Sequence, residues 1–468
     1  MNVRDQSPAA GGPPVRYALT GAAGGFARTL LAQSRLLPRL APVALCDLDT
    51  DRVVALCAAL GHDTGTLAVC DGADAVARAA AAGLIAVTAD AGALPAADWD
   101  VLVEATGRPA AGLATAEAAL AAGRHVAMVS KEVDSVAGIH LARTAAARGL
   151  VHTPVEGDQP ANLIGLVARL RGLGLDVVAI GKSSEYDLVL DPAAGTVTQL
   201  DTTVPAPGLT GLLDLGDDPR ATLAARARAV RALPVGATAD YCEMAVVADH
   251  TGFGPDTESL HYPVARPAEL ADVYAPREHG GVLRRPGAVD VFRALRLPGE
   301  ASFAGGVFAV VRTHDAETWR MLADKGHVLS RDGSHAAVYL PYHLMGVEAP
   351  DTLRAAAAGR ASGARHPRRA AVLAGRARHD LAVGDTLTMG GHHHDVTGVR
   401  AVLLRADEAP ADTAPLYLAA DTRVARPVAA GELIGLDDLA GADPGLLHAW
   451  HAGAEGAQGT TAGEGARR

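Results

Sequence analysis

Strand-like and helix-like segments alternate through the first 180 residues of this 468-residue chain, and this alternation restricts its fold more than any other feature. The expected strands are the β-rich runs 15–19, 42–47, 100–105, 125–130 and 151–155. Segments with helical spacing of apolar residues separate them, at 26–37, 51–60, 73–82, 113–122 and 138–148. A helix between successive strands is typical of βαβ units, which build a parallel sheet. We therefore expect an α/β fold with a Rossmann-type parallel sheet.

A glycine-rich turn lies between the first expected strand and the first expected helix. Gly21, Gly24 and Gly25 precede Phe26 in the sequence Gly-Ala-Ala-Gly-Gly-Phe-Ala. Glycines in this position let the backbone approach a pyrophosphate, which then meets the positive end of the helix dipole. The spacing is G-x-x-G-x-x-A and not G-x-G-x-x-G, so an ordinary glycine-rich turn is the alternative.

Four more residues at the ends of expected strands are candidates for binding the same cofactor. Asp47 ends the second strand, where a carboxylate accepts hydrogen bonds from a ribose 2′-hydroxyl and repels a 2′-phosphate. This slightly favours NAD over NADP; the alternative is that Asp47 caps the helix that begins near Asp51. Thr106 and Gly107 follow one strand and Ser130 ends the next, at the edge where open α/β sheets bind ligands.

Lysine is rare in this chain. Only three of its 42 basic side chains are lysines, and two of them, Lys131 and Lys182, follow expected strands. Arginine serves equally well as a solvated charge, so the lysines that remain favour chemistry that arginine cannot perform. We expect Lys182 to relay a proton or polarise a carbonyl, with Lys131 as its partner. The alternative is a solvated loop charge.

Two acids and a histidine complete the candidate catalytic set. Glu132 follows directly on the first of these lysines, and Asp158 precedes a helix that begins near Pro160. Both would position the substrate, and Asp158 can also cap that helix. His343 follows another expected strand and is a weaker candidate.

Three consecutive histidines at 392–394 have the composition of a metal site. Consecutive histidines on a turn or strand point in different directions, and no second cluster stands at ligand spacing. This motif predicts an exposed turn and no bound metal.

Charge and hydropathy exclude several classes of protein. The chain carries 53 acidic and 42 basic side chains, a net charge of −11, whereas nucleic-acid binders present a basic face. No run reaches the ~18 uncharged apolar residues that a membrane-spanning helix needs. Residues 1–14 are polar and lack the apolar core of a signal peptide. We expect a cytoplasmic homo-oligomer that acts on a small-molecule substrate.

Composition also divides the chain into segments. The predicted organisation is a disordered leader (1–14), a dinucleotide-binding domain (15–155), a catalytic domain (156–350), a helix and linker (351–369), a β-rich domain (370–445) and a disordered tail (446–468).

The motifs, taken in order, resemble those of homoserine-dehydrogenase-like oxidoreductases with a C-terminal SAF domain. The segments that carry the resemblance are 21–27, 103–107, 125–134, 157–160, 179–182, 341–344 and, for the SAF domain, 422–438. It implies a Rossmann domain, a homoserine-dehydrogenase-like α+β catalytic domain and NAD(P)-dependent interconversion of an alcohol and a carbonyl. By this resemblance, Lys131 matches the lysine after the cofactor-side strand of homoserine dehydrogenases, and Lys182 the lysine of the family's Gly-Lys segment.

Two other functions stay open. One branch of the family resembles a deoxyxylulose-phosphate reductoisomerase, which implies an NADPH-dependent enzyme with a divalent metal near Glu132, Asp158 and Glu185. The family usually continues its Gly-Lys segment with Gly-Thr-Lys-Tyr, and Ser-Ser-Glu-Tyr at 183–186 puts an anion in place of a cation, which disfavours a phosphorylated substrate. The altered glycine turn also allows a nucleotide-binding protein without catalysis.

Overall fold

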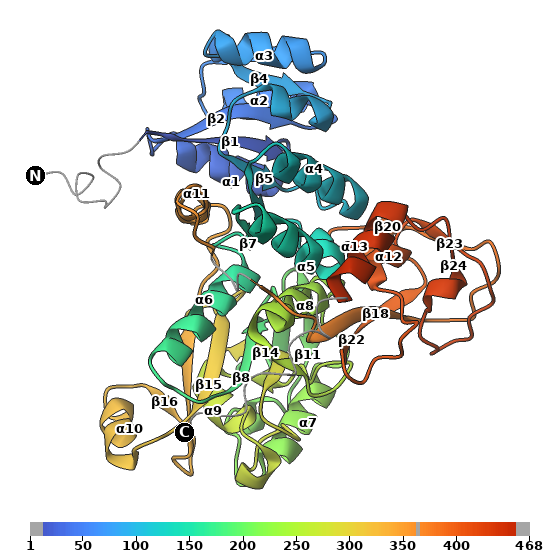
Figure 1. Cartoon of the computed structure of the whole chain (residues 1–468). Helices are drawn as coiled ribbons and strands as arrows, with labels where there is room; N and C mark the ends of the chain where they lie inside the picture. The colour runs from blue at the N-terminus through green and yellow to red at the C-terminus, as the bar shows by residue number, and fades with distance from the viewer. Residues whose placement is uncertain (1–12, 362–365, 455–468) are drawn as a thin grey trace, which may run out of the picture. The chain divides into compact units, whose positions relative to one another are not determined.

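A parallel sheet of seven strands organises the first part of the chain (Figure 1). The structure is a computed structural model that describes residues 13–361 and 366–454. In spatial order the strands are β3 (Leu67–Cys70), β4 (Ile85–Thr88), β2 (Leu40–Cys46), β1 (Val15–Thr20), β5 (Val101–Glu104), β6 (His125–Met128) and β7 (His152–Pro154). The strand order reverses between β1 and β5, which creates the crevice where such sheets bind ligands. The α/β class with a Rossmann-type sheet is confirmed.

The helices of this sheet bury one apolar face each. They are α1 (Gly25–Ser34), α2 (Thr50–Ala59), α3 (Ala73–Ala81), α4 (Pro109–Ala121) and α11 (Ala349–Ala357). Leu30 and Leu31 of α1 pack in one core cluster with Leu19, Leu45 and Val103 of the strands, all fully buried. A parallel sheet is covered on both faces, so its strands need apolar side chains along their whole length.

Two strands of this sheet are absent from the sequence prediction. The strands β3 and β4 have only four residues each, in the runs Leu-Ala-Val-Cys and Ile-Ala-Val-Thr. Runs this short show no clear periodicity in the sequence. Their parallel register, for example Val69 beside Val87, becomes visible only in the folded sheet.

The chain forms two compact units that are not continuous in sequence. Among the described residues, the first unit contains 13–130, 141–157 and 344–361, and the second contains 131–140, 158–343 and 366–454. The predicted domain boundary at residue 155 lies close to residue 157, where the chain passes from the first unit to the second. Helix α11 was predicted to belong with a linker. It belongs instead to the first unit, because Leu353 and Ala356 are fully buried in the core cluster of that unit.

The helix after β6 begins earlier than predicted. Helix α5 spans Lys131–Ala147, so Lys131 and Glu132 lie in its first turn and not in a loop. Ser130 is its N-cap, and Glu132 and Asp134 place negative charge at the positive end of the helix dipole, which favours an early start.

A second, mixed sheet of ten strands organises the second unit. Its main path is β11 (Thr202–Pro205), β10 (Thr196–Gln199), β9 (Leu188–Asp191), β14 (Ala288–Arg296), β8 (Val177–Ser183), β15 (Val307–Arg312), β17 (His335–Leu340) and β16 (Val328–Leu329). Two short strands, β12 (Gly254–Pro255) and β13 (Val264–Ala265), also pair with β14. The helices of this part are α6 (Gln159–Gly172), α7 (Pro219–Ala229), α8 (Thr238–Thr251), α9 (Leu270–Val273) and α10 (Ala316–Ala323). Strand β8 is buried along its whole length, so its side chains are held in fixed positions.

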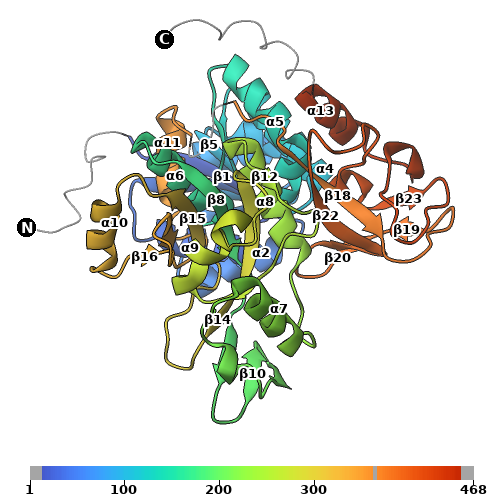
Figure 2. The same ribbon diagram turned by 90° about the horizontal axis from the view of Figure 1, so that it is seen from below.

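Short strands and turns follow in the C-terminal part of the second unit. They are β18 (Ala371–Ala377), β19 (Thr386–Leu387), β20 (Met389–Gly390), β21 (Asp395–Val396), β22 (Val399–Arg405), β23 (Thr422–Val424) and β24 (Leu439–Ala440), with helix α12 (Leu416–Ala419). Figure 2 shows the antiparallel pair of β18 and β22, whose register places Ala374 opposite Val402. The β-rich character agrees with the predicted segment 370–445, and the SAF assignment stays a prediction.

The prediction of a disordered tail at 446–468 is wrong for its first residues. Helix α13 spans Pro444–Ala454, and its Leu446, Ala449 and Trp450 are buried. Their spacing along the helix gives it an apolar face whose burial offsets the entropy lost on ordering. Residues 455–468 of the predicted tail and 1–12 of the predicted leader lie outside the described residues. No helix of the described ranges is long and apolar enough to cross a membrane.

A partly buried carboxyl joins the β-rich region to helix α8. Asp249 accepts hydrogen bonds from the backbone N–H groups of Ala370 at 2.8 Å and Ala371 at 3.4 Å. Burial raises the pKa of Asp249 to about 7. From about pH 4 to 7 the folded chain therefore holds a proton that the unfolded chain has lost, so stability falls as pH rises through this window.

Replacing Asp249 with Asn should remove this pH dependence. In the wild type, the free energy of unfolding should fall by up to about 1.4 kcal/mol per pH unit in that window. An amide side chain has no proton to lose there, so the variant should be flatter with pH, as measured by urea denaturation. The exposed Asp201→Asn is the matched control and should follow the wild type. Parallel curves for wild type and Asp249→Asn would refute the assignment.

Candidate active site

The glycine turn of the first unit joins β1 to α1, and its first position requires glycine. Gly21 has φ +63°, and a Cβ built there would lie 2.1 Å from the carbonyl oxygen of Ala105. Gly24 is the N-cap of α1 and offers no side chain to its first-turn N–H groups. A Cβ on Gly25 would meet no atom within 4 Å, so the space above the helix N-terminus is open. Phe26, by contrast, is buried in the core and does not line that space.

Asp47 braces this turn from the end of β2. Its Oδ2 accepts a hydrogen bond from the N–H of Ala23 at 2.9 Å, and its Oδ1 accepts one from Asp49 at 3.1 Å. Helix α2 is capped by Asp49 and not by Asp47, which removes the alternative considered from the sequence. Each carboxylate oxygen has a second lone pair, so the same side chain has acceptor capacity for a ribose hydroxyl.

The ends of β5 and β6 are tied together by hydroxyl groups. Ser130 Oγ accepts a hydrogen bond from the N–H of Gly107 at 2.8 Å. The fully buried Glu104 accepts from both the N–H and the hydroxyl of Thr106, at 3.1 and 2.6 Å, and from Thr20 at 3.2 Å. Burial raises the pKa of Glu104, although these donors oppose the shift. Thr106, Gly107 and Ser130 therefore shape the sheet edge beside Gly21, and their role in binding a cofactor stays a prediction.

Lys182 lies at the centre of a charged cluster in the second unit. It stands on β8, its side chain is only 2% exposed, and its Nζ contacts Asp240 Oδ1 at 2.7 Å and Glu243 Oε2. Burial alone would lower the pKa of Lys182, but the two carboxylates raise it above its ordinary value. Lys182 therefore remains an ammonium and does not exchange its proton readily near neutrality.

Both carboxylates come from helix α8 and were missed in the sequence. Asp240 and Glu243 are three residues apart and lie on one face of the helix. Oδ2 of Asp240 also accepts hydrogen bonds from the Tyr262 hydroxyl and the Ala237 N–H, each at 3.1 Å. Helix α8 is buried on nearly all sides, so its sequence lacks the amphipathic pattern by which helices are recognised. The sequence signal that remains for these residues is a pair of acids within the largely apolar segment of α8.

Lys131 shares Glu243 with Lys182. Its Nζ lies 2.5 Å from Glu243 Oε1, and its side chain remains 22% exposed. Burial lowers the pKa of Lys131, but the carboxylates of Glu243, Asp158 and Glu132 raise it well above the usual value. One glutamate thus holds both ammonium groups, and of the two lysines Lys131 has the accessible side chain.

Asp158 and His343 form a second pair in the same unit. Asp158 is the N-cap of α6, where its Oδ1 accepts from the Gln159 N–H at 3.0 Å, as predicted for a capping residue. The Nε2 of His343 lies 3.6 Å from Asp158 Oδ1. Burial raises the pKa of Asp158, but the Lys131 ammonium and His343 outweigh it and lower the pKa to about 2. The carboxylate is therefore ionised, and it faces the imidazole at a distance too long for a hydrogen bond.

Glu132 points to the histidine turn and is not free to bind a substrate. Its Oε1 lies 2.7 Å from His394 Nδ1, and the Glu132 side chain is only 5% exposed. The preceding histidines, His392 and His393, contact Glu185 instead. The turn is exposed at His392, as predicted, but the three imidazoles each face a carboxylate.

The structure brings together Lys131, Lys182, Asp158 and His343, through shared partners and charges in the second unit. It does not bring together the three carboxylates near which the reductoisomerase alternative places a divalent metal. In the described part of the chain, Glu132, Asp158 and Glu185 pair with different histidines and form no common ligand group.

Comparison with solved structures gives distant likenesses. The reductoisomerase of 1-deoxy-D-xylulose 5-phosphate from Zymomonas mobilis, in complex with NADPH, is 23% identical over 37% of this chain and 46% of its own, with a TM-score of 0.28. The WlbA dehydrogenase from Bordetella pertussis, in complex with NADH and UDP-GlcNAcA, is 17% identical over 39% of this chain and 48% of its own, with a TM-score of 0.27.

An oxidoreductase from Agrobacterium radiobacter, in complex with NAD+, L-tartaric acid and magnesium, is 14% identical over 74% of this chain and 87% of its own, with a TM-score of 0.34. The chain spans about half the length of the first two structures that it matches. A comparison with curated proteins found no match.

A family model gives the more specific result. Residues 157–349 match the oxidoreductase DRL catalytic domain. The match contains Asp158, Lys182, Asp240, Glu243 and His343. The charged cluster of the second unit therefore lies, apart from Lys131 and Glu132, in the part of the chain that matches an oxidoreductase catalytic domain.

Proposed function

We propose that this chain is an NAD(P)-dependent oxidoreductase that interconverts an alcohol and a carbonyl on a small polar substrate. The observation that carries the proposal is the Lys131–Glu243–Lys182 arrangement, in which one buried carboxylate holds two ammonium groups. The family match to an oxidoreductase catalytic domain supports the same class of reaction. A substrate like homoserine, as the sequence resemblance implies, is the first to test.

The residues of the first unit fit a dinucleotide. The bare N-cap of α1, the open space at Gly25 and the carboxylate of Asp47 provide for a pyrophosphate and a ribose. A carboxylate at Asp47 favours NAD over NADP, because it would repel a 2′-phosphate. The nicotinamide supplies the hydride in such enzymes, and the protein supplies orientation and proton transfer.

Lys131 is the residue proposed to polarise the reacting oxygen. Its ammonium is permanently charged and partly exposed, so it can donate a hydrogen bond to a carbonyl or alkoxide oxygen. Lys182 is buried, and its role is to position Glu243, which in turn orients Lys131. This revises the sequence hypothesis, in which Lys182 itself relays the proton or polarises the carbonyl.

His343 is the residue proposed to move the proton. Its Nε2 faces the ionised Asp158, and an imidazole oriented by a carboxylate is a common general acid–base arrangement. Asp158 then acts as a positioning residue that holds the ring and balances its charge. The weaker candidate from the sequence becomes the better placed acid–base group.

Substrate-dependent reduction of the cofactor tests the proposal. Purified protein is incubated with NAD+ or NADP+ and small polar alcohols, beginning with L-homoserine, and the absorbance of the reduced nicotinamide is followed. We expect turnover with NAD+ preferred, and a loss of about 10²–10⁴-fold in kcat for His343→Gln. His327→Gln, outside the cluster, is the control. Cofactor binding without turnover on any alcohol would leave a nucleotide-binding protein and refute the proposed activity.

A further inference from the structure

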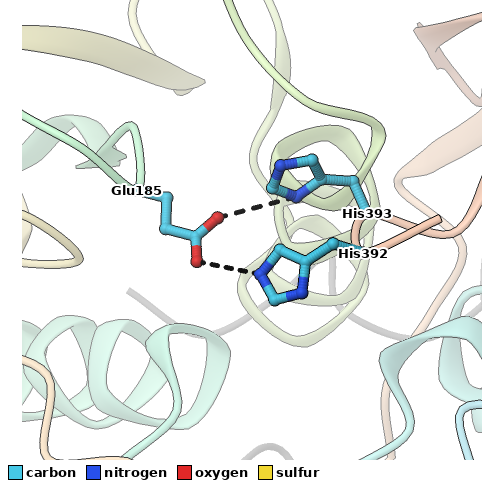
Figure 3. Close-up of side chains that lie close together, drawn as sticks. All are labelled: Glu185, His392 and His393. Carbon is cyan, nitrogen blue, oxygen red and sulfur yellow. Dashed lines mark hydrogen bonds and ion pairs between the residues drawn. The ribbon is translucent and has the colours of Figure 1, made fainter. Parts of the chain in front are cut away.

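Three metal-ligating side chains meet outside the lysine cluster. Figure 3 shows Glu185, from the loop after β8, facing His392 and His393 of the turn that joins β20 to β21. His392 Nε2 lies 3.5 Å from Glu185 Oε1, and His393 Nδ1 lies 3.5 Å from Glu185 Oε2. One ligand atom from each residue lies within 4.8 Å of the others. His392 uses Nε2 and His393 uses Nδ1, so these two consecutive histidines can both direct a nitrogen to the carboxylate of Glu185.

The two nitrogen–oxygen distances fit ligands of one shared metal ion better than they fit hydrogen bonds. A good hydrogen bond between nitrogen and oxygen measures about 2.7–3.2 Å, so 3.5 Å is long for both contacts. Tetrahedral ligands at about 2.0–2.1 Å from one Zn²⁺ ion lie about 3.3 Å from each other. Both nitrogens lie close to this separation from the carboxylate oxygens.

The turn that carries the histidines is held in place from both sides. His394 has φ +52° and binds Glu132 at 2.7 Å, and its carbonyl oxygen accepts from the Tyr417 hydroxyl at 3.3 Å. Asp395 accepts a hydrogen bond from Thr238 at the start of α8. A left-handed conformation is costly for a histidine and persists only where the surroundings impose it. These contacts hold the end of the turn that directly follows His392 and His393.

A cavity of about 250 Å³ lies beside the cluster. Its lining includes Glu185, His393, Tyr186, Leu200, Pro234 and Asp240. Asp240 is the carboxylate that pairs with Lys182, so this cavity reaches the charged cluster of the second unit. Three protein ligands beside an accessible cavity are typical of a metal site with open coordination positions, whereas structural sites are usually closed by four.

We propose that Glu185, His392 and His393 bind one divalent transition-metal ion, such as Zn²⁺ or Co²⁺. Two imidazoles and one carboxylate suit this class of ion and not Mg²⁺ or Ca²⁺, which prefer oxygen ligands. The open coordination positions face the cavity and take water or an oxygen atom of a small polar molecule. The site stands whether or not the chain has redox activity. It reverses the expectation from sequence that the histidine turn holds no metal.

A second group of possible ligands in the described residues serves as a contrast. His279, Asp332 and His335 also lie within reach of one another. Here, however, His279 Nδ1 lies 2.8 Å from Asp332, and Ser334 Oγ lies 2.6 Å from Asp332 and 2.7 Å from His335 Nδ1. Ordinary hydrogen bonds satisfy these atoms without an ion. This group supplies the control variant.

Direct metal binding to the full chain tests the proposal. The protein is stripped with a chelator, dialysed, and titrated with Co²⁺ alone while its visible ligand-field absorption is recorded, and Zn²⁺ binding is measured by calorimetry. We expect saturation at one ion per chain. Glu185→Gln and His393→Asn should each weaken Co²⁺ binding by at least about 100-fold, since both remove a direct ligand. His279→Asn should bind as the wild type does.

Circular dichroism of each variant verifies that it is folded, which the partial exposure of Glu185 and His393 favours. The proposal is overturned if the wild type does not saturate at one ion, if Glu185→Gln and His393→Asn bind like the wild type, or if only His279→Asn is impaired. Because neither nicotinamide nor an alcohol is present, the result is independent of the proposed oxidoreductase activity. Turnover without metal binding would refute this site alone.

Discussion

Replacing Lys182 with Met should lower the free energy of unfolding by about 3–5 kcal/mol. The substitution removes the cation between Asp240 and Glu243, whose side chains are each only 3% exposed. Two buried carboxyl groups one helical turn apart would then lack their shared partner, and only Lys131 would still pair with Glu243. Turnover should collapse by about 10³-fold or more, at about 1.4 kcal/mol for each factor of ten, because Glu243 no longer holds Lys131 in position. Affinity for the nicotinamide cofactor should change little, since Lys182 belongs to the second unit and the glycine turn to the core of the first.

Three further variants separate the structural role of Lys182 from its role in turnover. The exposed Lys325→Met is the matched lysine control and should leave stability and turnover unchanged. Combining Lys182→Met with Asp240→Asn and Glu243→Gln removes the unpaired charges and should restore much of the stability without restoring turnover. Urea denaturation, cofactor titration by fluorescence and steady-state kinetics give the three readouts. Unchanged turnover in Lys182→Met, or turnover restored in the triple variant, would remove Lys182 from the mechanism.

Replacing Gly21 with Ala should abolish cofactor binding and destabilise the first unit. The new Cβ would lie 2.1 Å from the carbonyl oxygen and 2.7 Å from the carbonyl carbon of Ala105, and the backbone has φ +63°. Neither atom belongs to a flexible side chain, so β1 and β5 must separate at the place where the sheet order reverses. We expect a loss of about 2–4 kcal/mol in stability and at least about 100-fold in cofactor affinity, measured by denaturation and fluorescence titration.

Two other glycines of the first unit provide the controls for this effect. Gly123→Ala also places a Cβ at positive φ but meets no atom within 4 Å, so it isolates the cost of the conformation, about 1 kcal/mol. Gly25→Ala is unobstructed in helix α1 and should keep or slightly raise stability. It should still weaken cofactor binding if the pyrophosphate lies over the helix N-terminus. Normal cofactor affinity in both Gly21→Ala and Gly25→Ala would place the cofactor elsewhere.

The Rossmann-type sheet could be predicted because its signals are local. The strand at 15–19, the turn at Gly21 and the helix that follows are adjacent in sequence, and each has a composition suited to its conformation. The same is true of Asp158, whose role as the cap of α6 follows from Pro160 two residues later. The short strands β3 and β4 were missed because four residues carry too little pattern without their pairing partners.

The candidate catalytic cluster could be predicted only in part. Lys131 and Lys182 stood out because lysine is so rare in this chain. Asp240 and Glu243 did not, because they lie on a helix buried on nearly every side, in a stretch interrupted by many prolines. The protonation state of the lysines also depends on these two acids. A desolvated lysine alone has a lowered pKa, whereas the paired carboxylates raise it here.

Local signals along the chain were enough to specify the alternating α/β order, the glycine turn and the two lysines at strand ends, since propensity, turn chemistry and composition act over a few neighbouring residues. Which charges meet, in contrast, follows only from the tertiary structure. Glu243 joins two lysines that are 51 positions apart (182 − 131 = 51), and Glu185 faces histidines about 200 positions further along the chain. Such contacts depend on the order and pairing of strands, and the balance between burial and Coulomb attraction then sets the charge on each group.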